Sequence, residues 1–297
     1  MTRVVCLGEC MVELSPAGEE LYRRGFAGDT FNSAWYLRRL LPETFSVDYV
    51  TCVGDDAISG EMRDFIAAAG IGTASLRAVP GRTVGLYAIS LRDGERSFTY
   101  WRSASAARTL AADPDWLAAQ LAGAGLILFS GITLAIVPPE DRPALLRSLS
   151  GARAAGATIA FDPNIRLRLW PDAAGARDGL TAAAAVSDLL LPSFEDEAVL
   201  FGDADPQATL ARYRALGART VIVKNGPGEV IGWDAADGRV AFTPTPITAT
   251  DTTAAGDSFN AGCLAARLDG AGLAAAIAAG ASLAARVCQS PGALVAL

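Results

Sequence analysis

The sequence predicts an α/β protein, in which a mostly parallel central sheet carries helices on both faces and a small group of further strands forms a lid. Three observations support this prediction. The 297 residues are 51% hydrophobic and 19% charged, which is typical of a globular protein with a large core. Short β-branched or apolar runs alternate with longer helical patterns. One stretch, residues 74–102, breaks that alternation with neighbouring strand-like runs.

The first predicted element is a buried strand at the N-terminus, because Glu9 follows the apolar start too soon for the core of a signal peptide. Further strands are predicted at residues 47–53, 125–130, 158–162, 189–192 and 219–224. Helices are predicted at residues 31–41, 58–69, 142–155, 207–216 and 259–267. Alternating strands and helices favour a parallel sheet that is covered on both sides.

The lid is predicted from two strand-like runs, 84–91 and 97–102, which flank residues 92–95. The Asp-Gly pair in that turn is typical of a β-hairpin. Residues 11–14 would join these strands, and such an appendage beside a nucleotide-binding fold would act as a lid. We therefore expect the lid strands at about residues 9–15 and 74–102.

Composition excludes several classes of function. Lys and Arg number 25 against 32 Asp and Glu, so the net charge of -7 offers no positive field to nucleic acid or anionic lipid. There is no histidine, which removes His-based triads and His-ligated zinc. The five cysteines form no Cys-x-x-Cys pair, and no apolar run reaches the ~20 residues that a membrane span needs. We expect a cytoplasmic protein of one domain, residues 1–297, without a nucleic-acid or membrane partner.

Residues 251–262 contain the clearest chemical motif. The small residues Ala254, Ala255 and Gly256 would let the backbone approach a ligand, and the free N–H groups of the following helix would face the same place. A phosphate could be held there by main-chain donors and the helix dipole, with Asp257 in the first turn accepting a hydroxyl proton. The dipole is expected to keep Asp257 ionised. An aspartate that only caps the helix is the other interpretation of this spacing.

The same residues, which begin Asp-Thr-Thr-Ala-Ala-Gly-Asp, resemble the C-terminal signature of the ribokinase-like (PfkB) sugar kinases, usually D-T-x-G-A-G-D. Ala254 replaces the first glycine, a change that is tolerable if this residue keeps a negative φ. Residues 28–32 and 53–60 are similar to the family's N-terminal and second-strand motifs. The resemblance covers nearly the whole chain, and it implies a ribokinase-like three-layer α/β/α sandwich that transfers phosphate from ATP to a sugar.

Within that family, the 2-keto-3-deoxygluconate (KDG) kinases are the nearest likeness. Residues 8–14, 85–87, 100–102 and 162–170 resemble their opening, lid and central loop. The resemblance implies phosphorylation of the terminal hydroxyl of KDG to give 2-keto-3-deoxy-6-phosphogluconate. Another kinase of the family, such as a fructokinase or ribokinase, is the first alternative. A non-catalytic sugar- or nucleotide-binding regulator on the same fold is the second.

The resemblance also implies a set of substrate-binding residues. Arg102 and Arg166 are the candidates for the carboxylate of KDG, because an arginine fork can make two charge-assisted bonds. Tyr87 and Tyr100 would form an aromatic wall, and we place Tyr100 rather than Trp101 toward the sugar because neighbouring strand residues face opposite sides. The other expected substrate contacts are Gly28, Asp29, Asn32 and Asp251. Each of these also has a purely structural interpretation, such as a strand end, a helix cap or a core position.

The sequence has no Walker motif and no G-x-G-x-x-G, so the nucleotide must be held in another way. The resemblance places nucleotide contacts at the turn of residues 224–228, where glycines suit a tight turn and Lys224 either adds a cation or closes a strand in solvent. The adenine pocket is expected between this turn and the helices around residues 279–290. The expected nucleotide-binding residues are Asn164, Ser193, Lys224, Gly226, Gly228 and Gly256.

Where the family has an N-x-x-E motif, which is associated with Mg²⁺, this sequence has Ser-Phe-Glu-Asp at residues 193–196. No direct metal ligand is predicted, and Glu195 or Asp196 would bind the ion through water. Mg²⁺ is expected to arrive with ATP, since it usually reaches kinase sites on the nucleotide phosphates. The sequence leaves open a monovalent cation, the choice between the gluconate and galactonate epimers, and the oligomeric state. A homodimer through the lid strands and a monomer with a shielded lid edge are both compatible.

Overall fold

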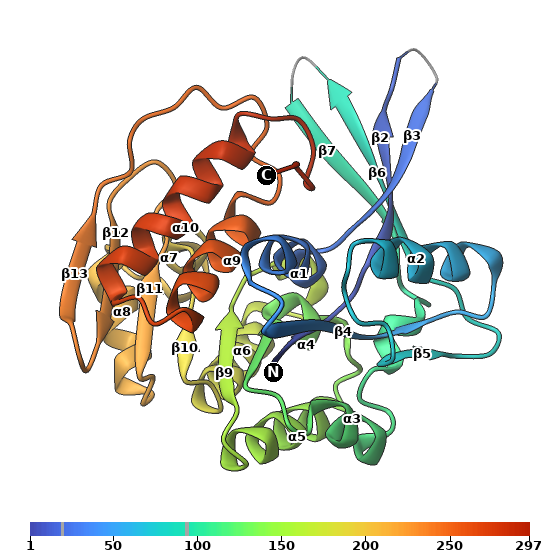
Figure 1. Ribbon diagram of the computed structural model, residues 1–297, viewed down its shortest axis with the longest axis horizontal. Coiled ribbons are helices and arrows are strands. Elements are labelled where there is room, and N and C mark those ends of the chain that lie inside the picture. Colours follow the sequence, from blue (N-terminus) through green and yellow to red (C-terminus); the bar gives the residue numbers. More distant parts are fainter. Residues whose placement is uncertain (19–20, 93–94) are drawn as a thin grey trace.

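The structure is a computed structural model that describes residues 1–18, 21–92 and 95–297. It contains a nine-stranded sheet between two layers of helices and a four-stranded sheet that projects from one side of this body (Figure 1). The predicted Asp93–Gly94 turn lies outside the described residues.

The large sheet has the strand order β13-β12-β11-β10-β9-β8-β1-β4-β5. Its strands are β1 (Thr2–Leu7), β4 (Phe45–Val53), β5 (Leu76–Ala78), β8 (Leu126–Ser130), β9 (Thr158–Asp162), β10 (Leu189–Leu190), β11 (Thr220–Val223), β12 (Val230–Asp234) and β13 (Gly238–Phe242). The pairs from β11 to β5 are parallel, as the alternating pattern predicts, and only β12 and β13 pair in antiparallel fashion.

The helices cover both faces of this sheet. They are α1 (Asp29–Leu40), α2 (Ala57–Ala68), α3 (Pro114–Leu121), α4 (Gly131–Ile136), α5 (Arg142–Ala154), α6 (Ala173–Ala185), α7 (Phe194–Phe201), α8 (Pro206–Ala215), α9 (Ala255–Leu268) and α10 (Leu273–Cys288). Along β1, Val4 and Cys6 belong to the core with α1, α2, α9 and α10, whereas Val5 and Leu7 belong to the core on the opposite face. This alternation confirms the three-layer α/β/α arrangement.

Several helix starts follow directly from the sequence. The side chains of Asp56, Asp113, Asp172 and Asp205 each accept a hydrogen bond from a backbone N–H in the first turn of α2, α3, α6 and α8. An aspartate at this position satisfies a donor that the helix itself leaves unpaired. No helix in the described ranges is both long and apolar enough to span a membrane.

The smaller sheet is the predicted lid, with the order β3-β2-β6-β7. Its strands are β2 (Met11–Pro16), β3 (Tyr22–Ala27), β6 (Gly85–Arg92) and β7 (Glu95–Trp101). Two details differ from the prediction. Strand β3 was not expected, because its first residues are polar and exposed. Residues 76–78 form β5 at the edge of the large sheet, where they pair with β4 instead of joining the lid.

Candidate active site

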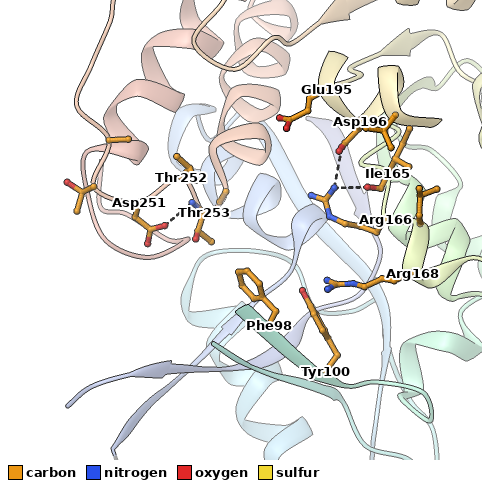
Figure 2. Close-up of a pocket in the computed structure, with 15 residues that line it drawn as sticks. Phe98, Tyr100, Ile165, Arg166, Arg168, Glu195, Asp196, Asp251, Thr252 and Thr253 are labelled. Carbon is orange, nitrogen blue, oxygen red and sulfur yellow. Dashed lines mark hydrogen bonds and ion pairs between the residues drawn. The ribbon is translucent and has the colours of Figure 1, made fainter. Parts of the chain in front are cut away.

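An inner cavity of about 290 Å³ lies between the lid and the carboxyl ends of the parallel strands. This is the usual place for a ligand in an open α/β sheet. An outer cavity of about 1000 Å³ adjoins it and shares part of its lining (Figure 2). The shared residues are Phe98, Tyr100, Arg166, Arg168, Asp196, Thr252, Thr253 and Ala254.

Asp257 occupies the first turn of α9 and lines the inner cavity. Two residues of α1 hold this segment: the Nδ2 of Asn32 donates to Oδ2 of Asp257 at 2.8 Å, and the hydroxyl of Ser33 donates to the Asp257 carbonyl at 3.1 Å. The Oδ1 of Asn32 accepts from the N–H of Gly28 at 3.3 Å. Both ends of the Asn32 amide are therefore engaged, which fixes the direction of the Asp257 carboxylate.

The charge state of Asp257 differs from the prediction. Burial, followed by repulsion from the carboxylate of Asp29, raises the pKa of Asp257 to about 8. The carboxylate of Asp162 adds to this increase, while Asn32 and Lys224 oppose it. The expectation that the helix dipole alone keeps this group ionised was wrong, because desolvation and like charges outweigh the dipole.

The loop before α9 also departs from the prediction at one residue. Ala254 has φ 60° and ψ 17°, in the left-handed region, so the negative φ that would make alanine tolerable here is not present. Helix α9 begins at Ala255, four positions before the predicted start, and this places Gly256 and Asp257 in its first turn. The N–H of Ala255 donates to the carbonyl of Thr252 at 3.2 Å. The next backbone donors of that turn, those of Gly256 and Asp257, have no acceptor within the helix and are suited to an anion.

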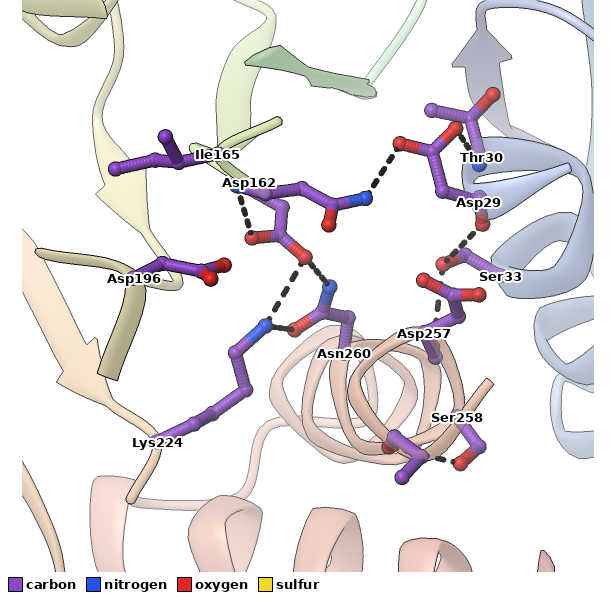
Figure 3. Close-up of polar contacts among 12 residues, drawn as sticks. Asp29, Thr30, Ser33, Asp162, Ile165, Asp196, Lys224, Asp257, Ser258 and Asn260 are labelled. Atoms are coloured by element: carbon purple, nitrogen blue, oxygen red, sulfur yellow. Dashed lines mark hydrogen bonds and ion pairs between the residues drawn. The ribbon is translucent and has the colours of Figure 1, made fainter. Parts of the chain in front are cut away.

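Lys224 lies beside the loop of residues 251–257, which is called the anion loop below. Its side chain is only 9% exposed, which excludes the solvent-facing strand end that the sequence left open. The Nζ donates to Asp162 and to Oδ1 of Asn260, each at 3.0 Å, and Nδ2 of Asn260 donates to Asp162 at 2.6 Å. A Cβ on Gly256 would lie 3.6 Å from Nζ, so the ammonium lies close to the loop. Figure 3 shows the contacts of Lys224 with Asp162 and Asn260. Asn260 is a site residue that the sequence analysis missed.

The network continues from Asp162 to α1 through Asn164. The N–H of Asn164 donates to Oδ1 of Asp162 at 3.1 Å, and its Nδ2 donates to Oδ2 of Asp29 at 2.8 Å. Asn164 adopts φ 34°, which an asparagine tolerates better than most residues do. Asn164 and Asp29 thus both line the inner cavity, as expected, and they also hold each other in place.

Arg102 has a partner within the protein. Its Nη2 donates to the carboxylate of Glu9, which is 2% exposed and follows the end of β1. The Nε of Arg102 has no hydrogen-bond partner among the described residues, and the role of Arg102 as a ligand of the substrate carboxylate stays a prediction. Gly85 makes room for the pair, because a Cβ there would lie 2.8 Å from Oε1 of Glu9. The sequence analysis did not identify Glu9 as a site residue.

Two other arginines reach the cavities from the segment after β9. Arg166 donates to Oδ2 of Asp196 at 3.2 Å and to the carbonyl of Ile165 at 2.7 Å. The guanidinium carbon of Arg168 lies 4.2 Å from the ring centre of Tyr100 (Figure 2). Arg166 was predicted as a carboxylate ligand and is already paired with an acid. Arg168 was not predicted.

The lid supplies the aromatic wall. Tyr87 is 7% exposed, lines the inner cavity and donates its hydroxyl to Glu13. Tyr100 lines both cavities, while its neighbour Trp101 is 59% exposed. The strand alternation therefore places Tyr100 on the cavity side, as expected.

Gly28 and Asp251 have structural roles in addition to their places in the lining. A Cβ on Gly28 would lie 2.1 Å from the carbonyl oxygen of Glu9, so only glycine allows these two chain segments to approach this closely. Asp251 accepts from the N–H of Thr253 at 2.9 Å and from the N–H of Gly292 at 2.7 Å. It therefore ties the anion loop to the C-terminal segment, and it lines the outer cavity only.

The expected nucleotide-binding residues are only partly brought together. Ser193, Lys224 and Gly256 line the inner cavity, whereas Gly226 and Gly228 line neither cavity. Gly226 has φ 51°, in keeping with the predicted tight turn. None of the residues from 279 to 290, where the adenine pocket was expected, lines either cavity.

No group of three or more acidic, Cys or His side chains in the described part of the chain is arranged to hold a metal ion. Glu195 and Asp196 lie in the first turn of α7 and line the outer cavity. Such carboxylates could bind the water molecules of a metal ion that is carried by nucleotide phosphates.

Comparisons with known proteins concern the chain as a whole. The description "pfkB family carbohydrate kinase" matches residues 1–297. The 2-dehydro-3-deoxygluconokinase of Dickeya dadantii is 36% identical over 99% of this chain and 97% of its own length. The enzyme of the same name from Haemophilus influenzae is 37% identical over 99% of this chain and 96% of its own. The crystal structure of a PfkB protein from Polaromonas sp. JS666 superposes with a TM-score of 0.87 at 28% identity, covering 97% of this chain and 96% of that one.

Proposed function

The chain belongs to the pfkB family of carbohydrate kinases, and from that membership we propose that it transfers the γ-phosphate of ATP to the terminal hydroxyl of KDG. KDG is another name for 2-dehydro-3-deoxygluconate, which the names of both full-length relatives contain. The activity is that of a phosphotransferase with an alcohol group as acceptor, and its product is 2-keto-3-deoxy-6-phosphogluconate.

One observation carries the proposal: Asp257 lies at the start of α9, beside main-chain donors, with its carboxylate directed by Asn32. The sugar would occupy the inner cavity with its hydroxyl near Asp257. As the hydroxyl oxygen bonds to the γ-phosphorus, its proton passes to the Asp257 carboxylate and the bond to ADP breaks. The N–H groups of the anion loop and the Lys224 ammonium would stabilise the negative charge on the phosphoryl oxygens.

The nucleotide would enter from the outer cavity, because that cavity reaches Thr252, Thr253 and Ala254 of the anion loop. Mg²⁺ would arrive on the ATP phosphates and neutralise part of their charge, with water-mediated contacts to Glu195 and Asp196. Ser193 and Asn164 are the further polar groups that line the inner cavity near these carboxylates. This arrangement would place the phosphates between a fixed ammonium and a metal ion.

The variant Asp257→Asn tests the proposal most directly. It keeps the shape of the side chain and removes the proton acceptor, so we expect kcat to fall by about 10²–10⁴-fold with little change in the KM for ATP. The measurement is ADP release, with detection of the phosphorylated sugar by mass spectrometry. Asp269→Asn, at the exposed C-terminal end of the same helix, is the matched control and should leave the rate unchanged.

A substrate panel separates the proposal from its rivals. KDG should have the highest kcat/KM when it is compared with its galactonate epimer and with fructose. A preference for fructose would identify a different sugar kinase of the same family. If none of the sugars leads to ADP release, the result would favour a non-catalytic regulator. If the Asp257→Asn variant keeps the wild-type rate, Asp257 is not the proton acceptor.

A further inference from the structure

A third cavity, of about 380 Å³, lies at the opposite end of the large sheet from the candidate active site. It is called the amino-end cavity here, because the first residues of four neighbouring parallel strands line it: Leu126, Thr158, Leu189 and Thr220. In Figure 1, α5 lies at this end of the body and the lid projects from the other. The amino-end cavity shares no lining residue with the inner and outer cavities. A ligand bound here would therefore not compete with sugar or nucleotide for space.

Three arginines from three different elements line the amino-end cavity. Arg153 lies in the last turn of α5, Arg267 lies in the last turn of α9, and Arg219 directly precedes β11. Among the described residues, Asp188 is the one acidic side chain in the lining. The whole chain has a net charge of -7, so this excess of guanidinium groups is local and opposes the overall charge.

Asp188 is engaged at both carboxylate oxygens. Its Oδ1 accepts from Nε of Arg153 at 3.0 Å and lies 2.9 Å from Nη2 of the same residue. Its Oδ2 accepts from the N–H of Ile159 at 3.0 Å. The Nε of Arg219 is 3.6 Å from Oδ1, which is beyond the usual range of a hydrogen bond. Asp188 therefore holds Arg153 firmly and Arg219 only loosely.

Arg267 also has partners within the protein. Its Nη2 lies 3.1 Å from Oδ2 of Asp234, and its Nη1 donates to the carbonyl of Ala271 at 3.1 Å. Arg153 and Arg267 both lie at the C-terminal end of a helix, where a positive charge complements the helix dipole. Ion pairing and the dipole thus explain these two arginines without any ligand.

Arg219 has no such structural explanation. Its side chain is 79% exposed and makes no hydrogen bond within the described part of the chain. An exposed ion pair at this distance contributes little to stability. The acids Asp188 and Asp234 balance two of the three arginines, so one positive charge is left over at the cavity. Arg219 carries that charge, and its guanidinium fork is available to an anion.

The rest of the lining is largely apolar. Leu126, Leu189 and Leu264 are each at most 6% exposed, and they contribute apolar surface beneath the arginines. The volume of the cavity is within the usual range for small-molecule sites. A ligand with an anionic head and an apolar or aromatic body would satisfy both parts of the lining. A phosphate head suits guanidinium groups that come from separate elements, because its oxygens point in several directions, whereas a carboxylate is planar.

We propose that the amino-end cavity binds a small organic phosphate, with Arg219 as the main ligand of the phosphoryl group beside the fixed guanidinium of Arg153. The site is separate from the candidate active site, since α9 begins near Asp257 and carries Arg267 in its last turn at the opposite end. The inference therefore goes beyond the proposed function and does not depend on it.

The test is isothermal titration calorimetry with phenyl phosphate, which combines a phosphate group with an apolar ring. ADP and KDG are present at saturating concentrations, so that the active site is occupied. Phenyl phosphate should bind to the wild type, and Arg219→Gln should raise its Kd by about 10–100-fold, because charge-assisted hydrogen bonds to the phosphate are lost. Arg219→Lys keeps the charge and loses the fork, so its Kd should lie between these two values.

Arg147→Gln is the matched control, because this arginine is exposed on α5 and lines none of the three cavities. It should keep the wild-type Kd for phenyl phosphate. Equal thermal midpoints of wild type and variants without the probe show that folding is unchanged. A second titration uses phenol, which lacks the phosphoryl group and should bind at least about tenfold more weakly.

Three results would overturn the proposal. The wild type may fail to bind phenyl phosphate, its Kd may equal that of Arg219→Gln, or phenol may bind as tightly as phenyl phosphate. The first two results would exclude the site at Arg219, and the third would exclude recognition of a phosphate. None of these readouts involves turnover, so a wild-type enzyme that rejects KDG would contradict the proposed function without changing the outcome at this cavity.

Discussion

Asp257 shows how strongly single neighbours on α1 control the proposed proton acceptor. Asn32 fixes the direction of its carboxylate, and Asp29 places a second negative charge nearby. The sequence located Asp257 at a helix start, but its charge depends on burial and on carboxylates that lie far away in the chain. Helix position alone therefore gave the wrong protonation state.

A pH dependence follows from the raised pKa. A general base must be unprotonated, so activity is present above the pKa of Asp257 and is lost as the pH falls through it. Because that pKa is raised, the acid limb of kcat/KM should lie near neutrality instead of near pH ~4, where an ordinary aspartate titrates. The Asp29→Asn variant removes one cause of the increase, and the limb should move to lower pH by about one unit.

The measurement is the pH profile of kcat/KM for wild type, Asp29→Asn and the exposed control Asp64→Asn. The control should keep the wild-type profile. A wild-type limb below pH ~5 would mean that Asp257 behaves as an ordinary aspartate.

The pair of Glu9 and Arg102 is a contact that the sequence did not predict. Arg102 was correctly placed at the cavity, and its partner was not foreseen, because Glu9 precedes it by 93 positions and no sequence pattern links the two. The pair joins Arg102, which follows lid strand β7, to Glu9, which follows β1. Arg168, two positions beyond Arg166, had no feature of its own in the sequence.

At the scale of elements, the anion loop depends on how α9 begins. Ala254 adopts the left-handed conformation immediately before the first turn, where the usual form of the signature D-T-x-G-A-G-D has glycine. A side chain at positive φ costs roughly 1–2 kcal/mol, which glycine avoids. The loop therefore keeps its shape against a small local strain.

The variant Ala254→Gly should relieve this strain. Glycine also makes the unfolded chain more flexible, so the net gain in the free energy of unfolding should be at most about 1 kcal/mol. We expect a slightly higher thermal midpoint, as measured by calorimetry. Ala255→Gly, one position later in a helical conformation, is the control and should give no gain. A destabilised Ala254→Gly variant would show that the alanine methyl group contributes packing that outweighs the strain.

The strands of the lid differ in how clearly their own sequences indicate them. Strands β6 and β7 follow from alternation in the sequence, whereas the sequence Tyr-Arg-Arg-Gly-Phe-Ala of β3 carries little strand character. Strand β3 exists because β2 offers it an antiparallel partner from Met11 to Pro16. The strand predicted at residues 189–192 is shorter in the structure, where β10 has two residues that pair with β9 and β11.

At the scale of the whole molecule, the lid leaves apolar side chains uncovered. Leu21 is 65% exposed, Tyr22 52% and Trp101 59%, and β3 and β7 are the edge strands of the smaller sheet. Unpaired strand edges tend to find a partner. Two statements stay predictions: residues 1–297 form a single domain with a lid, and the lid joins two copies of the chain.

Sedimentation velocity tests the predicted homodimer. At micromolar concentration the protein should sediment with twice the mass of one chain, because pairing of two lids would cover these apolar side chains. The variant Trp101→Lys should weaken the dimer by placing a charge in the contact, while the control Arg147→Gln should not. A wild-type monomer across this range would instead support a shielded lid edge.

The sequence by itself determined the layered α/β architecture, the lid hairpin strands and the loop that ends at Asp257, because hydrophobic period, capping and small-residue runs are local properties of the chain. Only the tertiary structure decided the partners and charges in the site. The pairs of Lys224 with Asp162 and of Asn32 with Asp257 join residues 62 and 225 positions apart. Burial and proximity of charges arise only when such distant segments fold together, and these two quantities determine which side chain is free to act.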